Sequence, residues 1–592
     1  MSLPRVPPAI DTAAPASAAP PAAWGAASGQ IVVGAVPRQL SGFLPRPGLL
    51  AKLAWAHERG SVVQVVTGLP GAGKTQLAAA YARARLAADW RLVAWVHAGN
   101  AENLLAGLGA VADAAGLPGG SGRDAAGAGQ AVRALLEADG ERCLLVLDDV
   151  ADPGLVRPFV PASGAAQVLI TTTSQPAADL GTPINVPVFS KEEALAFLAG
   201  RTGQGETGAA PLAAELGFLP LALAQAVAVI TGPKMGYRGY QKRLAALSLG
   251  EYLSPEGDEP YPRRVAESVL LSLDAVQVSD QTGVSSRVMA IMAVLSAGGV
   301  RRDLLHATGE AGALADGSAP VPAAAVDQAL AGLAERALLD VSLDGQAVSM
   351  HRLAARVVRE ALARHGRFTS VCRIAASVLE AHADALAELR DQPAVPDLPE
   401  QVGALADNAA RLADPADREL SDTLLRLRFL ALSQLIELGD GARAVAFGHQ
   451  LPADLERLLG PDHPRTLDAR ESLAVAYQSA GQSAVAIQMF ELALAARDRA
   501  HGPRHQDTIW SRNNLATAYR MSGQAARAVP LLEETLIDCQ RVLGVDDRTT
   551  KAVRDNLYRA YQEASQAEQA GDQQPGGPLA DQVGGDLQDD GP

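Results

Sequence analysis

The sequence predicts a multidomain chain that joins an α/β domain, built on a parallel sheet, to several helical regions. Three observations predict this fold class: a glycine-rich loop between a β-branched run and a helical run, short apolar runs that alternate with helical or turn-rich spacers, and a 42-residue repeat in the last third of the chain. A chain of 592 residues is too long for one hydrophobic core. Aromatic residues make up only 4%, which favours helices packed through small side chains.

The glycine-rich loop follows the β-branched run 62–66 and contains every residue of the phosphate-binding pattern G-x-x-x-x-G-K-[ST]. Its three glycines allow positive φ, so successive backbone N–H groups can point at one anion. The lysine adds a positive charge for the β- and γ-phosphates of ATP or ADP, the threonine hydroxyl is a ligand for Mg²⁺, and the helix formers that follow place the loop at a helix N-terminus. The predicted nucleotide-binding residues are Gly68, Gly71, Gly73, Lys74, Thr75 and Gln76, with Thr75 also a metal ligand.

Short apolar runs after this loop predict the other strands of the domain. They cover residues 92–96, 144–147, 168–171 and 184–188, and helical or turn-rich spacers separate them. This alternation predicts a parallel sheet with helices on both faces, in a nucleotide-binding domain from 37 to 190.

Two acids, Asp148 and Asp149, directly follow the apolar run 144–147. Because ligands bind at the carboxyl ends of strands in such sheets, Asp148 is predicted to hold Mg²⁺ through water. Asp149 is the predicted catalytic residue, which would orient an attacking water. The alternative is that the two acids only cap a helix that starts near Asp152-Pro153.

The period of the sequence changes after Ser190, where a serine cap and early carboxylates begin a helical domain from 191 to 255. Residues 256–365 contain several helical patterns, then two strand-like runs on either side of Asp344-Gly345. A D-G turn between such runs is typical of a hairpin, and helices with one hairpin predict a winged-helix domain. A helical linker is expected over 366–425.

The last third of the chain has a period of 42 residues. Gly460, Gly502 and Gly544 follow this spacing, as do rows of leucine and tyrosine. A fixed period with small residues at helix contacts predicts an α-solenoid of stacked helical hairpins over residues 426–568.

Both ends of the chain are expected to be disordered. Residues 1–36 form an Ala/Pro-rich tail that lacks the basic start and apolar run of a signal peptide, and residues 569–592 form an acidic tail.

Composition restricts the partners of the protein. The net charge of −15 argues against broad binding to nucleic acid or to anionic membranes. The longest apolar stretch, 219–230, is too short to span a bilayer. Three cysteines far apart in the chain indicate buried thiols in a reducing compartment, so we expect a cytoplasmic protein.

Three motifs accompany the phosphate loop in a fixed order: Phe-Leu-Pro-Arg-Pro-Gly at 43–48, Gly-Phe-Leu-Pro-Leu at 217–221 and Met-His-Arg at 350–352. Together they resemble the STAND class of signalling P-loop NTPases, and within it the bacterial NB-ARC proteins that end in tetratricopeptide repeats. The resemblance covers about residues 37–568. It implies that Arg46 lies near the nucleotide, that Pro220 packs on the adenine, and that His351 reaches the β-phosphate of bound ADP from the winged-helix domain.

The chain departs from the family pattern at three places. The family often has an arginine after two threonines that senses the γ-phosphate, whereas this chain has Thr171-Thr172-Thr173-Ser174 without an arginine. This departure implies slow hydrolysis at most. Arg352 replaces the aspartate of the family's M-H-D motif, which implies that the resting state is stabilised to a different extent. Pro45 replaces a glycine before Arg46.

The repeats resemble the 42-residue tetratricopeptide repeats of kinesin light chains. Rows of arginine and asparagine recur in register and would bind the carboxylates and backbone of an extended peptide if they line the concave face. The alternative is a solvated charged stripe or salt bridges within each repeat. The predicted partner-binding residues are Arg470, Arg512, Asn514, Arg554 and Asn556.

The resemblance implies a nucleotide-operated signalling switch, closed with ADP and open with ATP. Such a switch would sense a protein or peptide partner through its repeats, associate with further copies when active, and hydrolyse ATP slowly or not at all. Two other functions stay open. One is a winged-helix transcription regulator, which the acidic charge disfavours. The other is a passive peptide-binding scaffold with a structural nucleotide.

Overall fold

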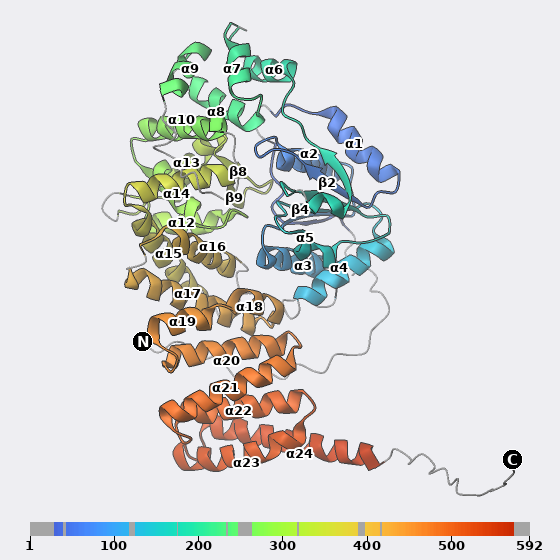
Figure 1. Ribbon diagram of the computed structural model, residues 1–592, viewed down its shortest axis with the longest axis vertical. Helices are drawn as coiled ribbons and strands as arrows, with labels where there is room; N and C mark the ends of the chain where they lie inside the picture. The colour runs from blue at the N-terminus through green and yellow to red at the C-terminus, as the bar shows by residue number, and fades with distance from the viewer. Residues whose placement is uncertain are drawn as a thin grey trace, which may run out of the picture. The chain divides into compact units, whose positions relative to one another are not determined.

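The computed structural model describes residues 29–39, 43–117, 125–174, 176–205, 207–231, 235–246, 263–315, 319–388, 397–414 and 417–572. These residues form two compact units, whose helices and strands are labelled in Figure 1. The larger unit holds the described residues up to Gly460 together with 475–481, and the smaller unit holds 461–474 and the described residues from Gln482 onward.

A six-stranded parallel sheet forms the centre of the first domain. Its strands lie in the order β1-β3-β4-β5-β2-β6, and each neighbouring pair is parallel. Each of the five apolar runs predicted as a strand is present, so the predicted parallel sheet is confirmed. The strands are β1 (Ile31–Val33), β2 (Val63–Thr67), β3 (Leu92–His97), β4 (Cys143–Asp148), β5 (Gln167–Thr171) and β6 (Thr182–Asn185).

The prediction of a tail over residues 1–36 is wrong for its last part. Ile31–Val33 is the edge strand β1, which pairs with residues 92–94 of β3. The run has only three residues after an Ala/Pro-rich segment, so its pattern alone does not distinguish it from a tail. Its position is fixed by pairing with a neighbour 61 residues away in the chain. Residues 1–28 lie outside the described residues.

Helices cover both faces of the sheet because alternate strand residues point to opposite sides. Val93 and Leu144 face one core with Leu53 of α1, whereas Ala94 and Leu145 face a second core. The second core also contains the apolar residues of α3 and α4. The elements are α1 (Pro47–Glu58), α2 (Lys74–Ala87), α3 (Ala101–Ala115), α4 (Ala125–Asp139), α5 (Pro153–Val156) and the 3-10 turns η1 (Arg157–Phe159) and η2 (Pro176–Leu180).

Four helices follow the sheet, in the region predicted as a helical domain over 191–255. Ser190 caps the first of them, and its side chain and that of Glu193 each bond the other residue's backbone N–H. The helices are α6 (Lys191–Thr202), α7 (Ala209–Glu215), α8 (Pro220–Thr231) and α9 (Tyr237–Ala246). The predicted boundary at 255 lies outside the described residues.

The next region combines helices with a small antiparallel sheet of order β7-β9-β8. The predicted hairpin is present, with Leu339 paired to Met350 and Gly345 at φ 73° in the turn. Asp344 fixes this turn by accepting the Gln346 N–H. The elements are α10 (Arg263–Ser279), α11 (Val284–Val294), β7 (Val300–Arg301), α12 (Arg302–Glu310), α13 (Ala323–Glu335), β8 (Leu339–Val341), β9 (Ala347–Met350) and α14 (Arg352–Arg364).

Among the described residues, five further helices follow up to Gly460. The predicted boundary between linker and repeats, at 425, falls inside α17, so the linker is not separated there from the helices that follow. These helices are α15 (Phe368–Glu388), α16 (Leu398–Leu412), α17 (Arg418–Glu437), α18 (Gly441–Gly448) and α19 (Leu451–Leu459).

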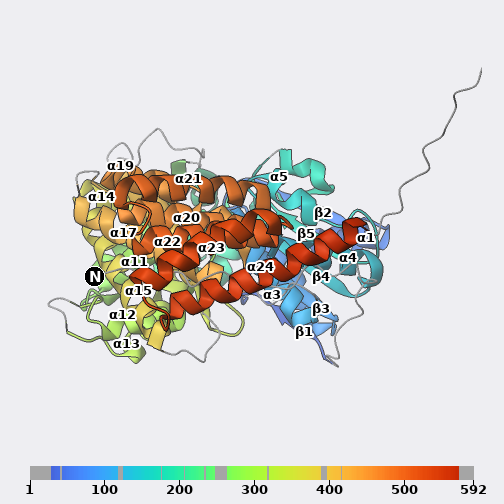
Figure 2. The same ribbon diagram turned by 90° about the horizontal axis from the view of Figure 1, so that it is seen from below.

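The 42-residue repeat corresponds to helical hairpins, of which α22, α23 and α24 pack side by side in Figure 2. Gly481 and Gly523 end the first helix of two hairpins with φ near 75°, a conformation that favours glycine. The last helix runs on to Asp572, so the predicted acidic tail begins inside a helix, and residues 573–592 lie outside the described residues. The helices are α20 (Pro464–Ser479), α21 (Ser483–His501), α22 (Gln506–Met521), α23 (Ala525–Val542) and α24 (Arg548–Asp572).

Candidate functional site

The glycine-rich loop joins β2 to α2 with the positive φ values that its sequence predicts. Gly68, Gly71 and Gly73 have φ of 145°, 79° and 95°. A Cβ atom on Gly68 would lie 2.5 Å from the Val186 carbonyl oxygen, so this position also lacks room for a side chain. The loop therefore keeps its backbone exposed to the space in front of α2.

Lys74 begins α2 and turns back over the loop. Its Nζ donates to the carbonyl oxygens of Gly68 at 3.0 Å and Leu69 at 3.1 Å. These bonds place the ammonium group beside the backbone N–H groups of the loop, where the phosphates of a nucleotide are expected.

Thr75 and Asp148 lie together at the carboxyl end of β4. The Thr75 hydroxyl donates to Asp148 Oδ1 at 3.1 Å, and the Thr171 hydroxyl donates to the same oxygen at 2.5 Å. Asp148 is only 4% exposed. A hydroxyl and a carboxylate are hard oxygen donors of the kind that Mg²⁺ prefers, so this pair fits the predicted metal role. The helix cap proposed as an alternative is made by Asp152, which accepts the Gly154 N–H.

Asp149 has an uncommon backbone conformation and contacts Thr171 and Arg352. Its φ is 67°, and its N–H donates to the Thr171 hydroxyl at 2.8 Å. Its carboxylate forms an ion pair with Arg352, the first residue of α14. Arg352 also reaches the neighbouring loop, since a Cβ on Gly99 would lie 2.8 Å from its guanidinium. The predicted catalytic acid is therefore engaged by a cation from the region after the helical domain.

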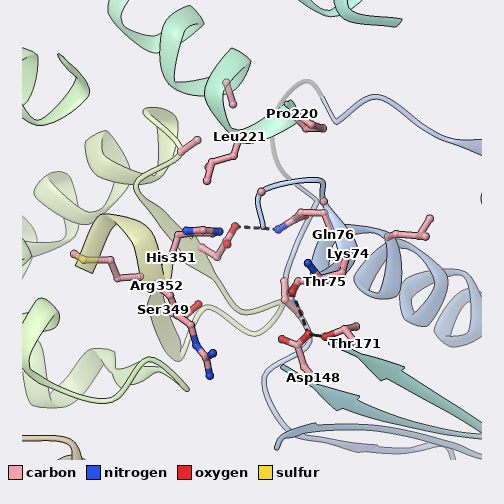
Figure 3. A pocket seen from close by; sticks show the side chains of 18 of the residues that line it. Lys74, Thr75, Gln76, Asp148, Thr171, Pro220, Leu221, Ser349, His351 and Arg352 are labelled. Carbon is pink, nitrogen blue, oxygen red and sulfur yellow. Dashed lines mark hydrogen bonds between the residues drawn. The ribbon is translucent and has the colours of Figure 1, made fainter. Parts of the chain in front are cut away.

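His351 caps α14 and lines the same cavity as Lys74 (Figure 3). Its Nδ1 accepts the Leu353 N–H at 3.2 Å. Burial, with the nearby charges of Lys74 and Arg352, lowers the pKa of His351 to about 4. The ring is neutral at pH 7, and because Nδ1 is an acceptor, the proton is on Nε2, which can donate to an anion.

Pro220 is the first residue of α8 and also lines this cavity. The next residue, Leu221, donates its backbone N–H to the Gly71 carbonyl oxygen at 3.2 Å. The start of α8 is thus bonded directly to the phosphate loop. The packing of Pro220 on an adenine stays a prediction.

Arg46 lines the cavity, and its guanidinium contacts other protein groups. Its guanidinium donates to the carbonyl oxygens of Pro187 at 2.7 Å and Val188 at 3.3 Å, and lies 3.6 Å from the Glu193 carboxylate. These contacts tie the start of α1 to the segment between β6 and α6, a role that the motif alone did not indicate. Its contact with a nucleotide stays a prediction.

One cavity of about 290 Å³ joins these residues. It is lined from three parts of the larger unit: the parallel-sheet domain, helices α6 and α8, and the region from 297 to 352. Figure 3 shows Lys74 and His351 on facing segments of the cavity, with Pro220 and Leu221 on a third. The predicted nucleotide, metal and catalytic residues that line it are Arg46, Gly71, Gly73, Lys74, Thr75, Gln76, Asp148, Asp149, Pro220 and His351.

His97 and Asp340 are among the polar residues of this cavity that sequence reasoning missed. His97 ends β3 directly beside Asp148 in the sheet, and burial lowers its pKa more than the Asp148 charge raises it. Asp340 in β8 accepts from Gln76 at 3.2 Å, and burial together with the Asp148 charge raises its pKa to about 6. The position of His97 at a strand's carboxyl end could have identified it. Asp340 carries no such pattern.

Two arginines of the row in the repeats, Arg470 and Arg512, make hydrogen bonds within their own repeats. Arg512 is 4% exposed, forms an ion pair with Asp538 at 3.0 Å, and donates to the Pro503 carbonyl oxygen at 3.0 Å. Arg470 makes the equivalent bond to the Pro461 carbonyl oxygen at 3.2 Å. Arg512 thus has a structural role inside its own repeat, as the alternative of salt bridges within each repeat predicts, and its binding of a partner stays a prediction.

The other predicted partner-binding residues differ from Arg512 in exposure. Arg554 is exposed, and Asn514 is partly buried. Asn556 is also partly buried, and its Nδ2 donates to Asn513 Oδ1 at 3.1 Å. Binding of a partner by Arg470, Arg554 and the two asparagines in this row stays a prediction.

No helix among the described residues combines the length and apolar content needed to cross a bilayer.

Comparisons with known proteins find a family match in the repeats. The tetratricopeptide repeat family model matches residues 429–499 and 486–536. No curated protein sequence matches the chain.

Several solved structures of low sequence identity, including the following three, are similar to the chain. A Signal Transduction ATPase with Numerous Domains (STAND) protein with a tetratricopeptide repeat sensor, from Pyrococcus horikoshii, is 13% identical, with 91% of this chain and 83% of that chain covered and a TM-score of 0.37. A Walker-type ATPase of Pyrococcus abyssi is 13% identical, with 55% and 98% covered and a TM-score of 0.29. A kinesin light chain with nearly identical TPR-like repeats from Podosopora anserina is 22% identical, with 36% and 87% covered and a TM-score of 0.24. With the helical hairpins described above, the family match identifies residues 429–536 as tetratricopeptide repeats.

Proposed function

We propose that this protein is a nucleotide-operated signalling switch of the NB-ARC type, in which ADP holds the larger unit closed and ATP favours an open form. The observation that carries this proposal is the cavity of about 290 Å³, because the phosphate loop, the start of α8 and the start of α14 all line it. A ligand in this cavity would touch three successive regions at once. Its binding would therefore depend on how those regions are arranged.

The residues of the cavity suit a nucleoside diphosphate with Mg²⁺. The loop N–H groups and Lys74 would bind the phosphates, and Thr75 and Asp148 would hold the metal, which supplies positive charge between the phosphate oxygens. The Nε2–H of His351 would donate to the terminal phosphate. Pro220 would pack on the base. In this proposal the helices and small sheet of residues 263–364 form the winged-helix domain that brings His351 to the site.

The Arg352–Asp149 ion pair supports a closed, inactive arrangement. In this proposal Asp149 would orient an attacking water, but its carboxylate is paired with a guanidinium from α14. Movement of α14 away from the sheet would release Asp149. Closure and suppression of hydrolysis would thus be coupled through one residue, which fits a slow ATPase that acts as a switch.

The repeats would supply the input to this switch. Tetratricopeptide repeats form extended surfaces suited to peptides and proteins. A partner that binds the open form better than the closed form would shift the equilibrium, whereas one with equal affinity for both would not. The open, ATP-bound form would then associate with further copies.

The decisive experiment is the charge reversal Arg352→Glu. It replaces an ion pair with two facing carboxylates, so ADP should leave faster and ATP should promote larger species. Since both side chains are 37% exposed, the pair contributes about 1 kcal/mol or less, and we expect a two- to fivefold increase in the ADP release rate. Stopped-flow release of a fluorescent ADP analogue and size-exclusion chromatography measure the two effects.

The matched control is Arg356→Glu on the same helix, where the arginine pairs with Glu360 at 2.8 Å. This variant should release ADP at the wild-type rate. Equal release rates for Arg352→Glu and Arg356→Glu would contradict the proposed lock.

A passive peptide scaffold with a structural nucleotide is the second candidate function. It is favoured by the engagement of Asp149 and by the absence of arginine from Thr171 to Ser174. The two functions differ in nucleotide exchange: a switch should exchange ADP for ATP when a partner binds, and a scaffold should retain its nucleotide.

A buried acidic cluster in the larger unit predicts that its stability depends on pH. Glu102 of α3 and Glu400 of α16 lie near Arg443 of α18, and the Arg443 guanidinium is 3.9 Å from the Glu102 carboxylate. Glu400 accepts from the Ser296 hydroxyl. Burial is the main cause that raises the pKa of Glu102 and of Glu400 to about 7.

This cluster predicts that the larger unit loses stability as pH rises. Each acid binds its proton more tightly in the folded state than at the ordinary pKa of 4.5, so the free energy of unfolding falls between pH 4.5 and about 7 and stays low above pH 7. Glu400→Gln removes one of these titrations. Its Tm should exceed the wild-type value at pH 8 by a few degrees, about 2–4 °C for each kcal/mol of relief.

Differential scanning calorimetry from pH 5 to 8 measures this effect, with the exposed Glu58→Gln as the control. A Tm difference between Glu400→Gln and wild type that does not grow with pH would contradict the prediction.

A further inference from the structure

The turn between α21 and α22 brings three metal-binding side chains together. His501 ends α21, His505 is the residue before α22, and Asp507 lies in the first turn of α22. One possible ligand atom from each lies within 4.8 Å of the others, and the two imidazole centroids are 4.6 Å apart. We propose that this cluster is a binding site for a divalent transition metal ion of the Zn²⁺ class, distinct from the Mg²⁺ site of the nucleotide.

A comparison with the matching positions of the neighbouring repeats shows which residues of this cluster the repeat structure itself requires. His463 and His505 occupy the same register position, and each accepts through Nδ1 the backbone N–H two residues later at 3.2 Å. That cap explains a histidine at this position without a metal. It does not explain the other two ligands, because the matching positions of the neighbouring turns hold different residues. Leu459 and Leu543 match His501, whereas Arg465 and Thr549 match Asp507.

His501 has a ring nitrogen that the protein does not satisfy. Its Nδ1 is buried and has no hydrogen-bond partner among the described residues. A buried polar atom left in this way costs about 1–3 kcal/mol, so its retention calls for an explanation. Coordination of a cation through Nδ1 would satisfy this atom.

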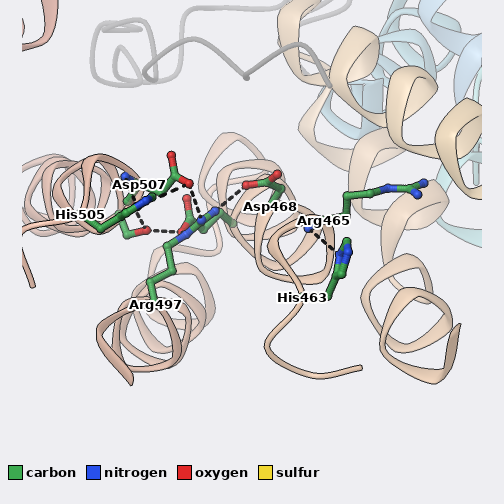
Figure 4. Close-up of polar contacts among 8 residues, drawn as sticks. His463, Arg465, Asp468, Arg497, His505 and Asp507 are labelled. Atoms are coloured by element: carbon green, nitrogen blue, oxygen red, sulfur yellow. Dashed lines mark hydrogen bonds and ion pairs between the residues drawn. The ribbon is translucent and has the colours of Figure 1, made fainter. Parts of the chain in front are cut away.

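The surrounding charges favour a cation despite the nearby Arg497. This guanidinium is 3% exposed and pairs most closely with Asp468 at 2.5 Å and Glu471 at 2.6 Å, and Asp507 lies farther away at 3.6 Å. Figure 4 shows Arg497 between Asp468 and Asp507. Three carboxylates around one guanidinium leave an excess of negative charge that a divalent ion would neutralise.

Arg497 would not bind the metal ion itself but could orient one of its ligands. Carboxylates that bind metals are commonly held by a second hydrogen-bonding partner, and Arg497 is in position to hold Asp507. In addition, His501 is the last residue of α21, whose C-terminus carries partial negative charge.

The donor set selects the kind of metal. Two imidazoles and one carboxylate suit Zn²⁺, Co²⁺ or Ni²⁺, whereas Mg²⁺ and Ca²⁺ prefer oxygen donors throughout. Three protein ligands leave a position for water. A bound ion would join the end of α21 to the start of α22 and would stabilise this turn by binding the folded state alone.

The test is isothermal titration calorimetry, in which ZnCl₂ is titrated into the untagged full-length protein in the presence of millimolar Mg²⁺. We expect one Zn²⁺ per chain bound through this cluster and at least a tenfold loss of affinity in His501→Leu. Leucine occupies this position in both neighbouring turns, so the variant should keep its fold. His505→Asn is a second variant that removes a ligand while it preserves a helix cap.

Two further measurements make the result decisive. Visible absorption of bound Co²⁺ reports nitrogen ligation, and it should disappear in His501→Leu. His463→Leu removes the equivalent cap histidine from the preceding turn and should leave Zn²⁺ affinity unchanged. Absence of Zn²⁺ binding to the wild type, or equal affinity in wild type, His501→Leu and His505→Asn, would overturn the proposal.

Discussion

Replacement of Lys74 by alanine is expected to lower the affinity for both ADP and ATP by at least tenfold. The Lys74 ammonium group lies within 3.1 Å of two loop carbonyl oxygens, beside the N–H groups that would bind the phosphates. Its removal takes a positive charge and its hydrogen bonds from the phosphate contacts, a loss of about 1.4 kcal/mol or more. Isothermal titration calorimetry with each nucleotide, in the presence of Mg²⁺, measures the change.

The control for this prediction is Lys52→Ala on the exposed side of α1. It changes the net charge by the same amount, so it shows whether a general electrostatic effect contributes. If Lys74→Ala binds both nucleotides as tightly as Lys52→Ala does, the loop is not a phosphate site and the proposed switch fails with it.

Replacement of Arg512 by alanine is expected to destabilise the repeats by about 3–5 kcal/mol. The variant leaves the Asp538 carboxylate buried without its closest cation, and it also frees the Pro503 carbonyl from the guanidinium. Arg504, at 3.7 Å, would remain near Asp538 but is itself 65% exposed. Hydrogen–deuterium exchange of the α22 and α23 amides should accelerate by at least a hundredfold.

Arg554→Ala is the matched control, because Arg554 occupies the same register position but is exposed. Its exchange rates should stay close to those of the wild type, since surface substitutions usually change stability by about 0.5 kcal/mol or less. If Arg512→Ala instead keeps wild-type exchange rates and weakens binding of a peptide partner, the partner-binding role returns to Arg512.

The parallel sheet could be predicted because its strands carry their own pattern. A run such as 144–147 is apolar throughout, and this indicates a strand buried on both faces wherever its neighbours lie. The phosphate loop was equally predictable, since its positive φ values require glycine at fixed spacing. The edge strand Ile31–Val33 was not, because its three residues depend on pairing with β3.

Contacts between distant segments explain the rest of what the sequence did not indicate. Spacing places Arg470, Arg512 and Arg554 in one row but does not say which face of the helix is covered. The burial of Arg512 follows from Asp538 on the next helix. In the same way, Arg352 is visible in the sequence only as a departure from a motif, and its pairing with Asp149 depends on the packing of regions more than 200 residues apart. The fold was thus more predictable than the engagement of its site residues.

Three helices meet the cavity with their first residues: α2 at Lys74, α8 at Pro220 and α14 at Arg352. Each helix N-terminus carries roughly half a positive charge, and the three come from different regions of the larger unit. Like charges that line one cavity repel each other, so an anion bound in the cavity would offset part of this repulsion. A bound polyphosphate would be such an anion. Its contacts with the three helix N-termini would then stabilise the association of the three regions together with the contacts between the protein surfaces.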